Sequence, residues 1–222
     1  MQRSGLFLLG LCLTFCFFSS CVIAVVEYSD EGLPVLEKFQ RVLPLDFGGT
    51  ISLENINGDI EISGWDREEV EVYAEKMILR PLKKRVRIVR RRISTPKIDI
   101  DRFEDFIKIK TLEEESSREA RRVDFYIKVP QSIILKDIST GEGEIIISDL
   151  YGELSVDLKH GNLIVENYSG SLTALVDEGS VRTSLVDLRE KDEINITVEK
   201  GDMVVYLPEG MSVEIEGSAP NG

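Results

Sequence analysis

The sequence predicts an all-β fold in which short strands stack into a β-solenoid, with about nine residues in each unit of strand and turn. Three observations predict it. Glycine recurs every nine residues from Gly143 to Gly179, apolar residues follow each of these glycines at alternate positions, and similar units recur near both ends of the chain. A unit of this length cannot bury an apolar face alone, whereas successive stacked units can.

Strand periodicity supports this repeat. The five glycines stand at corners, where a positive φ angle lets the chain turn between short strands. Residues two and four positions after each glycine share one face of a strand, so they are predicted to line the interior. They are Ile145, Ile147, Leu154, Val156, Leu163, Val165, Leu172, Ala174, Val181 and Thr183. The residues between them are mostly polar and are predicted to face water.

The same pattern recurs outside this block. Met203 and Val205 follow Gly201 in the same register, and Gly49 and Gly58 are again nine residues apart. The alternative fold is an antiparallel β-sandwich, because a meander of hairpins also uses short alternating strands with turns at intervals of about 8 to 12 residues. The strict spacing favours the solenoid.

The chain begins with an export segment. A basic start and an apolar run at residues 6–18 precede two serines and Cys21, which is the layout of a secretory signal peptide. Residues 1–20 are therefore predicted to be a lipoprotein-type signal peptide, with Cys21 as the lipidated first mature residue. Two alternatives stay open: a single-pass membrane anchor, because the apolar run continues to Val26, and ordinary cleavage after Ala24.

The rest of the chain divides into a tether and one domain. Residues 21–46 are predicted to be a tether and residues 47–222 the β-solenoid domain. Within that domain, residues 66–136 are predicted to form an irregular β insertion, because the nine-residue spacing is lost there while strand-like alternation persists. Asn221 and Gly222 repeat the Asn-Gly corner that begins a strand at residues 57–58, so the solenoid is predicted to be cut short at its C-terminal end.

Composition and charge exclude several classes of function. The net charge of −13 opposes binding to nucleic acid, because such a surface repels the phosphate backbone. All three cysteines lie in the first 21 residues, and the one histidine is His160, beside Gly161, in a context typical of a solvated turn. Without a second histidine or a cysteine in the mature region, transition-metal sites and histidine-dependent catalytic dyads are not expected. No cofactor is predicted.

One basic stretch interrupts the acidic chain. Eight of the thirteen residues 80–92 are lysine or arginine, with no acid among them: Arg80, Lys83, Lys84, Arg85, Arg87, Arg90, Arg91 and Arg92. They are the candidate contact for an anionic surface, such as lipid head groups, lipopolysaccharide or an acidic partner. The alternative is a solvated face that is neutralised by acids of the protein itself, notably residues 113–115.

Residues 48–72 resemble a bacterial family of unknown function known as the putative adhesins. The Asn-Gly-Asp-Ile element at residues 57–60 and the Gly-Trp-Asp element at residues 64–66 are similar to those of the family, as is the strand at residues 123–130 that ends in Val-Pro. The resemblance covers about residues 45–222 and implies an exported, right-handed β-helix. Its motifs are turns and inward-facing residues, so it implies a fold and transfers no binding residues.

These features favour a non-catalytic exported envelope protein with an adhesin-like binding or scaffold surface. The membrane is the expected partner of the N-terminal lipid or anchor. An envelope protein or a surface polysaccharide is the expected ligand. The protein is predicted to lie in the cell envelope, on the periplasmic or cell-surface side.

A carbohydrate-active enzyme is the alternative, because β-helices include polysaccharide lyases and glycosidases. Glycoside hydrolysis needs two carboxylates about 5 to 9.5 Å apart. Candidate acids fall at outward or corner positions without a cationic or aromatic companion: Asp149, Asp157, Glu166, Asp177 and Asp187. A calcium-binding β-roll is not favoured, because no regular ladder of oxygen ligands follows the corner glycines. Trp65 is interpreted as a packing residue at a strand edge.

Overall fold

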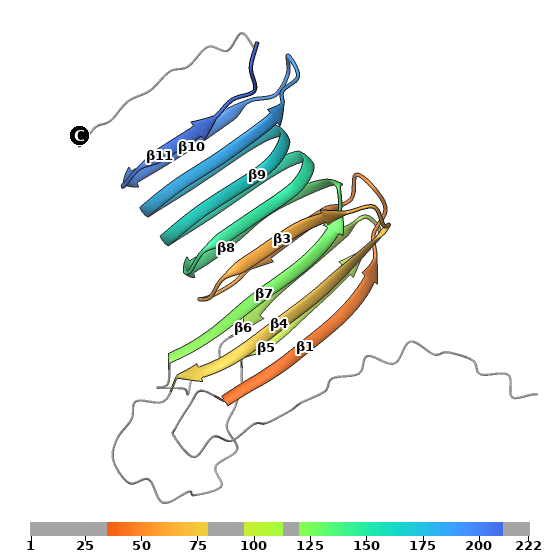
Figure 1. The fold of residues 1–222 in the computed structure, drawn as a ribbon. Helices are drawn as coiled ribbons and strands as arrows, with labels where there is room; N and C mark the ends of the chain where they lie inside the picture. Colours follow the sequence, from red (N-terminus) through yellow and green to blue (C-terminus); the bar gives the residue numbers. More distant parts are fainter. Residues whose placement is uncertain (1–34, 80–95, 113–119, 211–222) are drawn as a thin grey trace, which may run out of the picture.

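The computed structural model describes residues 35–79, 96–112 and 120–210. Within them the protein is all-β, with eleven strands and no helix (Figure 1), so the predicted fold class is confirmed at this level. The strands are β1 (Val35–Pro44), β2 (Thr50–Glu54), β3 (Ile60–Trp65), β4 (Glu69–Leu79), β5 (Lys97–Phe103), β6 (Phe106–Leu112), β7 (Ala120–Pro130), β8 (Ser132–Glu142), β9 (Ile145–Asp187), β10 (Ile194–Lys200) and β11 (Met203–Tyr206).

All the described strands belong to one sheet. Their order is β1-β4-β7-β3-β9-β8-β2-β6-β5, with β10 and β11 both paired to β9. β4 runs antiparallel to β1 and β7, and β5 runs antiparallel to β6, whereas the other pairs are parallel. Figure 1 shows the strands stacked one above another, with β10 and β11 at one end and β1 at the other.

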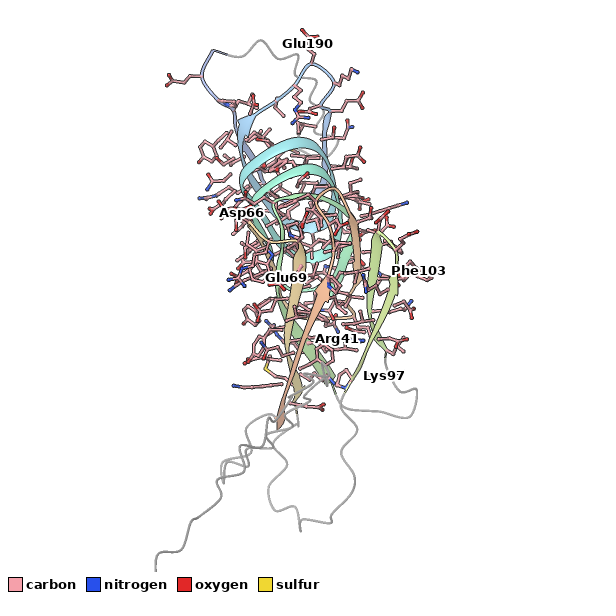
Figure 2. The ribbon with its side chains drawn as sticks, turned by 90° about the vertical axis from the view of Figure 1, so that its right-hand side faces the viewer. Arg41, Asp66, Glu69, Lys97, Phe103 and Glu190 are labelled. Carbon is pink, nitrogen blue, oxygen red and sulfur yellow. The ribbon has the colours of Figure 1, made fainter. Side chains whose placement is uncertain are left out.

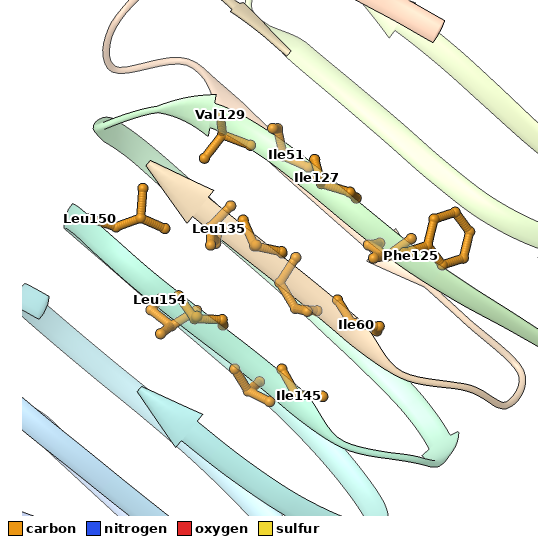
Figure 3. Close-up of a cluster of buried hydrophobic side chains, with 14 of the residues drawn as sticks. Ile51, Ile60, Phe125, Ile127, Val129, Leu135, Ile145, Leu150 and Leu154 are labelled. Atoms are coloured by element: carbon orange, nitrogen blue, oxygen red, sulfur yellow. The ribbon is translucent and has the colours of Figure 1, made fainter. Parts of the chain in front are cut away.

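The sheet curls back on itself around a buried core. Viewed from the side, Asp66, which follows β3, and Phe103 of β5 lie on opposite sides of the molecule (Figure 2). Ile60 of β3 belongs to the same buried cluster as Ile51 of β2 and Leu135 of β8 (Figure 3). These three side chains are at most 1% exposed. Apolar burial from both halves of the sheet is therefore the main favourable contribution to folding.

β9 is not one straight strand. It is 43 residues long, several times the usual length of a strand, and positive φ angles bend it at corners such as Asp149 and Asn167. Its parallel partners change along its length: residues 145–148 pair with β3, residues 151–160 with β8, residues 172–178 with β10 and residues 181–184 with β11. Hydrogen bonds join side chains 18 residues apart, from Asn167 to Asp149 and from Ser180 to Asn162.

At other corners of β9, glycines lie directly on one another. The predicted corner glycines, from Gly143 to Gly179, all have φ between 119° and 151°. A Cβ atom built on Gly161 would lie 1.8 Å from the carbonyl oxygen of Gly143, and one built on Gly179 would lie 1.6 Å from that of Gly161. Only glycine can occupy these positions without displacing the backbone beneath it.

The predicted interior of the repeat is confirmed. All ten positions that the periodicity assigns to the interior, from Ile145 to Thr183, are at most 3% exposed. Met203 and Val205 pair with Val181 and Thr183 as the register predicts, but they are 44% and 36% exposed. Met203 and Val205 are more exposed than the ten interior positions because β11 lies at the end of the stack, where no described strand covers it.

The stack accepts a longer turn before β10. Residues bonded across it are 22 apart in sequence, as in the contact of Lys200 with Glu178, instead of 18. The additional residues lie between β9 and β10, where Arg189 and Asp192 hydrogen bond to each other through N–H donors at 2.7 and 2.9 Å. The register of β10 on β9 remains parallel and continuous from Ile194 to Val198.

The Asn-Gly-Asp-Ile element at residues 57–60 forms the corner between β2 and β3. The backbone N–H of Gly58 donates to the carbonyl of Glu142, and the Thr140 hydroxyl donates to the carbonyl of Gly58. The Asp59 carboxylate accepts the backbone N–H of Glu144 at 2.8 Å. The element therefore attaches the β2–β3 corner to the start of β9, which is a structural role.

The predicted tether at residues 21–46 is wrong over its last part. Residues 35–44 form β1, which pairs with β4 along its whole length. Leu43 is buried at 7% exposure and Phe39 packs against the core. Alternation between charged and apolar residues is weak in this segment, and its pairing partner lies far along the sequence, so the strand was not evident from periodicity.

The predicted insertion at residues 66–136 contains β4 to β7 and the first residues of β8. These strands do not form a separate sheet, because β7 lies between β4 and β3 and β6 pairs with β2. The region continues the same sheet with antiparallel pairs added at its edges.

Replacing Gly161 by alanine is expected to lower the free energy of unfolding by more than about 3 kcal/mol, because the new methyl group meets backbone as well as a strained φ. Gly48→Ala is the matched control, since Gly48 also has positive φ, at 82°, but has nothing within 4 Å of a built Cβ. It should lose only about 1 to 2 kcal/mol. Chemical denaturation of both variants measures the difference. If both variants lose the same free energy of unfolding, the close contact between Gly161 and Gly143 does not contribute to stability.

Candidate functional site

A hollow on the outer face of β3, β4 and β7 is the strongest candidate site in the described part of the chain. Its volume is about 240 Å³. We call it the tyrosine hollow, and it is lined by Glu61, Ser63, Glu71, Tyr73, Tyr126, Ile127 and Lys128. Its small volume and its position on a sheet face suit one ligand unit better than an enclosed cofactor.

Strand register brings these residues together. β4 and β7 are antiparallel, with Tyr73 directly opposite Tyr126 and Glu71 directly opposite Lys128. β3 runs parallel to β7 on its other side and places Glu61 beside Tyr126. Neighbouring side chains on one face of paired strands contact each other. Alternate residues of the same strands are buried in the core, so the hollow is carried on a rigid support.

The two tyrosines form its aromatic wall. Their ring centroids are 5.9 Å apart and the rings are tilted by 45°. Tyr126 is 42% exposed, so part of its ring is open to a ligand. The Tyr73 hydroxyl donates a hydrogen bond of 2.6 Å to the Glu75 carboxylate, which fixes the orientation of the Tyr73 ring.

The surroundings hold both phenols in their neutral form. The hydrogen bond to Glu75 raises the pKa of Tyr73 to about 12, with burial as a second cause. Burial raises the pKa of Tyr126, and the negative charges of Asp124 and Glu75 add to that effect. At neutral pH the aromatic wall therefore carries no charge of its own.

The other polar groups of the hollow are unevenly charged. The Glu71 carboxylate accepts a hydrogen bond of 2.9 Å from the Gln40 side-chain amide. The Lys128 ammonium lies 5.7 Å from the centroid of the Trp65 ring. Among the described residues, Glu61, Glu71 and Lys128 form no ion pair closer than 4.0 Å. Two carboxylates and one ammonium make the hollow locally acidic.

Trp65 lies beside the hollow as a packing residue. Its indole N–H donates to the carbonyl of Glu69 at 2.8 Å. The Arg67 guanidinium lies 4.7 Å from its ring centroid, and the Lys128 ammonium lies near the same ring. These contacts engage the indole with residues of the protein itself, which fits the interpretation of Trp65 as a packing residue.

The acids that the sequence suggested for glycoside chemistry do not line the hollow. Asp149 is at a corner with positive φ, where it accepts a hydrogen bond from the Asn167 side chain. The other four are spread along β9, each on a surface or partly exposed position: Asp157, Glu166, Asp177 and Asp187. His160 is solvated, as predicted, with a side-chain exposure of 59% and Nδ1 at 3.6 Å from Glu178.

The predicted lipidation site Cys21 and the basic residues from Arg80 to Arg92 lie outside the described residues. In the described ranges, three or more histidine, cysteine or acidic side chains do not converge in a way that could hold a metal ion. The same ranges contain no helix long and apolar enough to cross a membrane.

Sequence reasoning missed the tyrosine hollow. Strand alternation alone puts Tyr73 and Glu71 on one face of a strand and Tyr126 and Lys128 on one face of another. That signal was present at residues 69–74 and 123–130. The sequence did not show that these two strands pair in the register that places the tyrosines opposite each other.

Comparison with known proteins gives structural likenesses only. No family model and no curated protein matches the chain. A putative cell adhesion protein from Clostridium sporogenes is 12% identical, with 77% of this chain and 98% of that chain covered and a TM-score of 0.41. A putative adhesin from Parabacteroides merdae is 11% identical (76% and 77% covered, TM-score 0.24), and one from Bacteroides fragilis is 8% identical (77% and 97% covered, TM-score 0.28).

At such identities and TM-scores these structures assign no family, ligand or binding residue to this chain.

The raised pKa of Tyr73 predicts a pH dependence. An unfolded tyrosine loses its proton near its ordinary pKa of 10.0, whereas Tyr73 in the folded protein keeps it until about 12. Between these values the unfolded state binds fewer protons, so this residue makes the stability fall as pH rises through the interval. Glu75→Gln should move the pKa of Tyr73 back towards 10.0, because it removes the negative charge that opposes ionisation of the phenol, while the amide oxygen can still accept the Tyr73 hydroxyl.

Tyrosinate absorbance during an alkaline titration measures this shift. Tyr73→Phe identifies which part of the curve belongs to Tyr73. If Glu75→Gln and the wild type titrate identically, the contact with Glu75 does not set the pKa of Tyr73.

Proposed function

We propose that this protein is a non-catalytic, exported envelope protein that binds a surface polysaccharide in an adhesin-like manner. The tyrosine hollow is the observation that supports this function best. It combines a partly exposed aromatic ring with hydrogen-bonding groups of both kinds, and ligand sites with this composition fix orientation through a few polar groups around an apolar surface.

The chemistry of the hollow suits a saccharide. The exposed face of Tyr126 offers an apolar surface to the C–H face of a sugar ring, and such aromatic contacts bury a large area without costly side-chain ordering. The carboxylates of Glu61 and Glu71 accept hydrogen bonds from hydroxyl groups, and the Lys128 ammonium donates them. Because the lining residues stand on paired strands, little order is lost on binding.

We further propose that the stacked segments of β9, with the strands that flank them, form a right-handed β-solenoid. The hydrogen bonds between residues 18 apart and the glycines stacked at the corners support two strand units in each coil. Such a stack gives long flat faces, and solenoids commonly use such extended surfaces for binding. In this arrangement the tyrosine hollow lies on one outer face near the N-terminal end.

Tyr126→Ala is expected to weaken binding to polysaccharide from the envelope of the source organism by about tenfold, which corresponds to one aromatic contact of about 1.4 kcal/mol. Tyr151→Ala is the matched control, because Tyr151 is also 42% exposed and does not line the hollow. It should bind as the wild type does. Titration calorimetry of the full-length chain in detergent measures both affinities.

Thermal unfolding of each variant shows that a loss of affinity is not a loss of folding. If Tyr126→Ala binds the polysaccharide as tightly as the wild type does, the tyrosine hollow is not the binding site. Equal losses in both variants would mean that exposed tyrosines contribute non-specifically.

A carbohydrate-active enzyme remains the second candidate because Glu61 and Glu71 both line the hollow together with aromatic residues and a lysine. They stand on β3 and β4, on either side of β7, so their strands are about 10 Å apart. Glycosidase carboxylates are separated by about 5 to 9.5 Å. Release of new reducing ends from the bound polysaccharide, lost in Glu61→Gln, would favour the enzyme over the binding protein.

We also propose that Cys21 is lipidated and anchors the chain in the cell envelope, and that the basic stretch from Arg80 to Arg92 contacts an anionic surface. The support for both is the sequence pattern alone.

Cys21→Ala tests the anchor in the native host. The wild-type protein is expected to have an intact mass that begins at a lipidated Cys21 and to partition into the membrane fraction. The variant should be released or left unprocessed. A wild-type chain without lipid would contradict the proposal, and its N-terminal residue would then distinguish an uncleaved anchor from cleavage after Ala24.

A further inference from the structure

We propose that the saccharide unit bound in the tyrosine hollow carries a protonated amino group, so that the ligand is a polymer containing amino sugars with free amines. This inference rests on the proposed function and names the ligand class for the same site. The combination of two carboxylates and a neutral aromatic wall in one hollow points to it.

The carboxylates stand on both sides of the exposed ring. Glu61 is the direct neighbour of Tyr126 on β3, and Glu71 lies on β4 beside Tyr73. The Gln40 amide is the hydrogen-bond partner of Glu71, and among the described residues neither carboxylate forms an ion pair within 4.0 Å. An ammonium group placed over the Tyr126 ring would therefore lie between two negative charges.

The aromatic wall adds to the preference for a cation. A cation near the face of a tyrosine ring is attracted by the quadrupole of the ring, most strongly where water is excluded. The Tyr73 and Tyr126 ring centroids are 5.9 Å apart, and the ring planes make an angle of 45°. Two rings this close to each other can both attract one small cationic group bound in the hollow.

Lys128 does not cancel this preference. Its ammonium lies 5.7 Å from the centroid of the Trp65 ring, where it is held at one side of the hollow. It balances one of the two lining carboxylates at most, so the hollow keeps an excess of negative charge.

The neighbouring cations are already engaged by acids outside the hollow. Arg122 donates to the carboxylates of Asp59 and Asp124. The Lys38 ammonium lies 3.9 Å from the Glu75 carboxylate. In the described part of the chain, these two cations are therefore paired with acids and do not offset the charges of Glu61 and Glu71.

The net charge of the whole chain also favours a cationic ligand. Its net charge of −13 repels polymers of uronic or sialic acids and attracts cationic polymers over distances of about one Debye length. Neutral sugars would be accepted by the same hydrogen bonds but would gain no charge attraction from the two carboxylates. The charge therefore selects among saccharides that the aromatic ring alone would not distinguish.

Chitosan and chitin hexamers test the proposal, because they share one sugar backbone and differ in the free or acetylated amine. The full-length wild type should bind the chitosan hexamer about tenfold more tightly than the chitin hexamer at low salt, since two nearby carboxylates contribute about 1.4 kcal/mol. Glu61→Gln and Glu71→Gln should each reduce that preference by about threefold. Binding of the chitin hexamer should change little in either variant.

Glu153→Gln is the matched control, because Glu153 is an exposed carboxylate on β9 that does not line the hollow. It should keep the full preference for the chitosan hexamer. If it loses the preference to the same extent, the attraction belongs to the overall charge and the proposed subsite is wrong. Thermal unfolding of the three variants confirms that each is folded.

The remaining outcomes separate this inference from the proposed function. Equal affinity for both hexamers, or no binding of either, overturns the amino-sugar ligand. In both cases the comparison of Tyr126→Ala with Tyr151→Ala on envelope polysaccharide still decides whether the hollow binds saccharide at all. Loss of the charge preference with retained dependence on Tyr126 leaves a neutral-sugar site.

Discussion

At several corners of the sheet, the backbone of one glycine lies against the carbonyl of a glycine in the segment beneath it. Gly143, Gly161, Gly179 and Gly201 form one such column. The contact sets how closely successive segments approach, and this distance allows the parallel hydrogen bonds of β9 to form with β3, β8, β10 and β11. A side chain at any of these corners would separate the segments and open the interior between them.

Close stacking also fixes the positions of the side chains on the outer surface. Inward positions are filled by aliphatic side chains that are almost fully buried, so the strands have little freedom to shift. The residues between them point outward from a fixed backbone. On β3, β4 and β7 that outward set brings Tyr73, Tyr126, Glu61 and Glu71 into one hollow. The hollow is thus a direct product of strand pairing, and its lining residues all lie on strands.

The parts of this structure that were predictable from sequence are those set by local repetition. The burial of Leu163 and Val165 could be predicted because apolar residues recur at the same two distances after each corner glycine. This signal lies within short segments of the sequence. The strand β1 and the tyrosine hollow depend on pairing between distant segments. Tyr73 and Tyr126 meet only through the antiparallel register of β4 and β7, and nothing in either segment alone specifies that register.

The longer turn between β9 and β10 shows that a connection can lengthen without any change in how the flanking strands pack. Extra residues between Leu188 and Glu193 change the sequence separation of stacked residues, yet the strands on either side keep their pairing. Insertions at such a corner alter only the outline of the protein, since no buried residue has to move. A corner of this stack can therefore change in length and in surface chemistry at a small entropic cost while the interior stays the same.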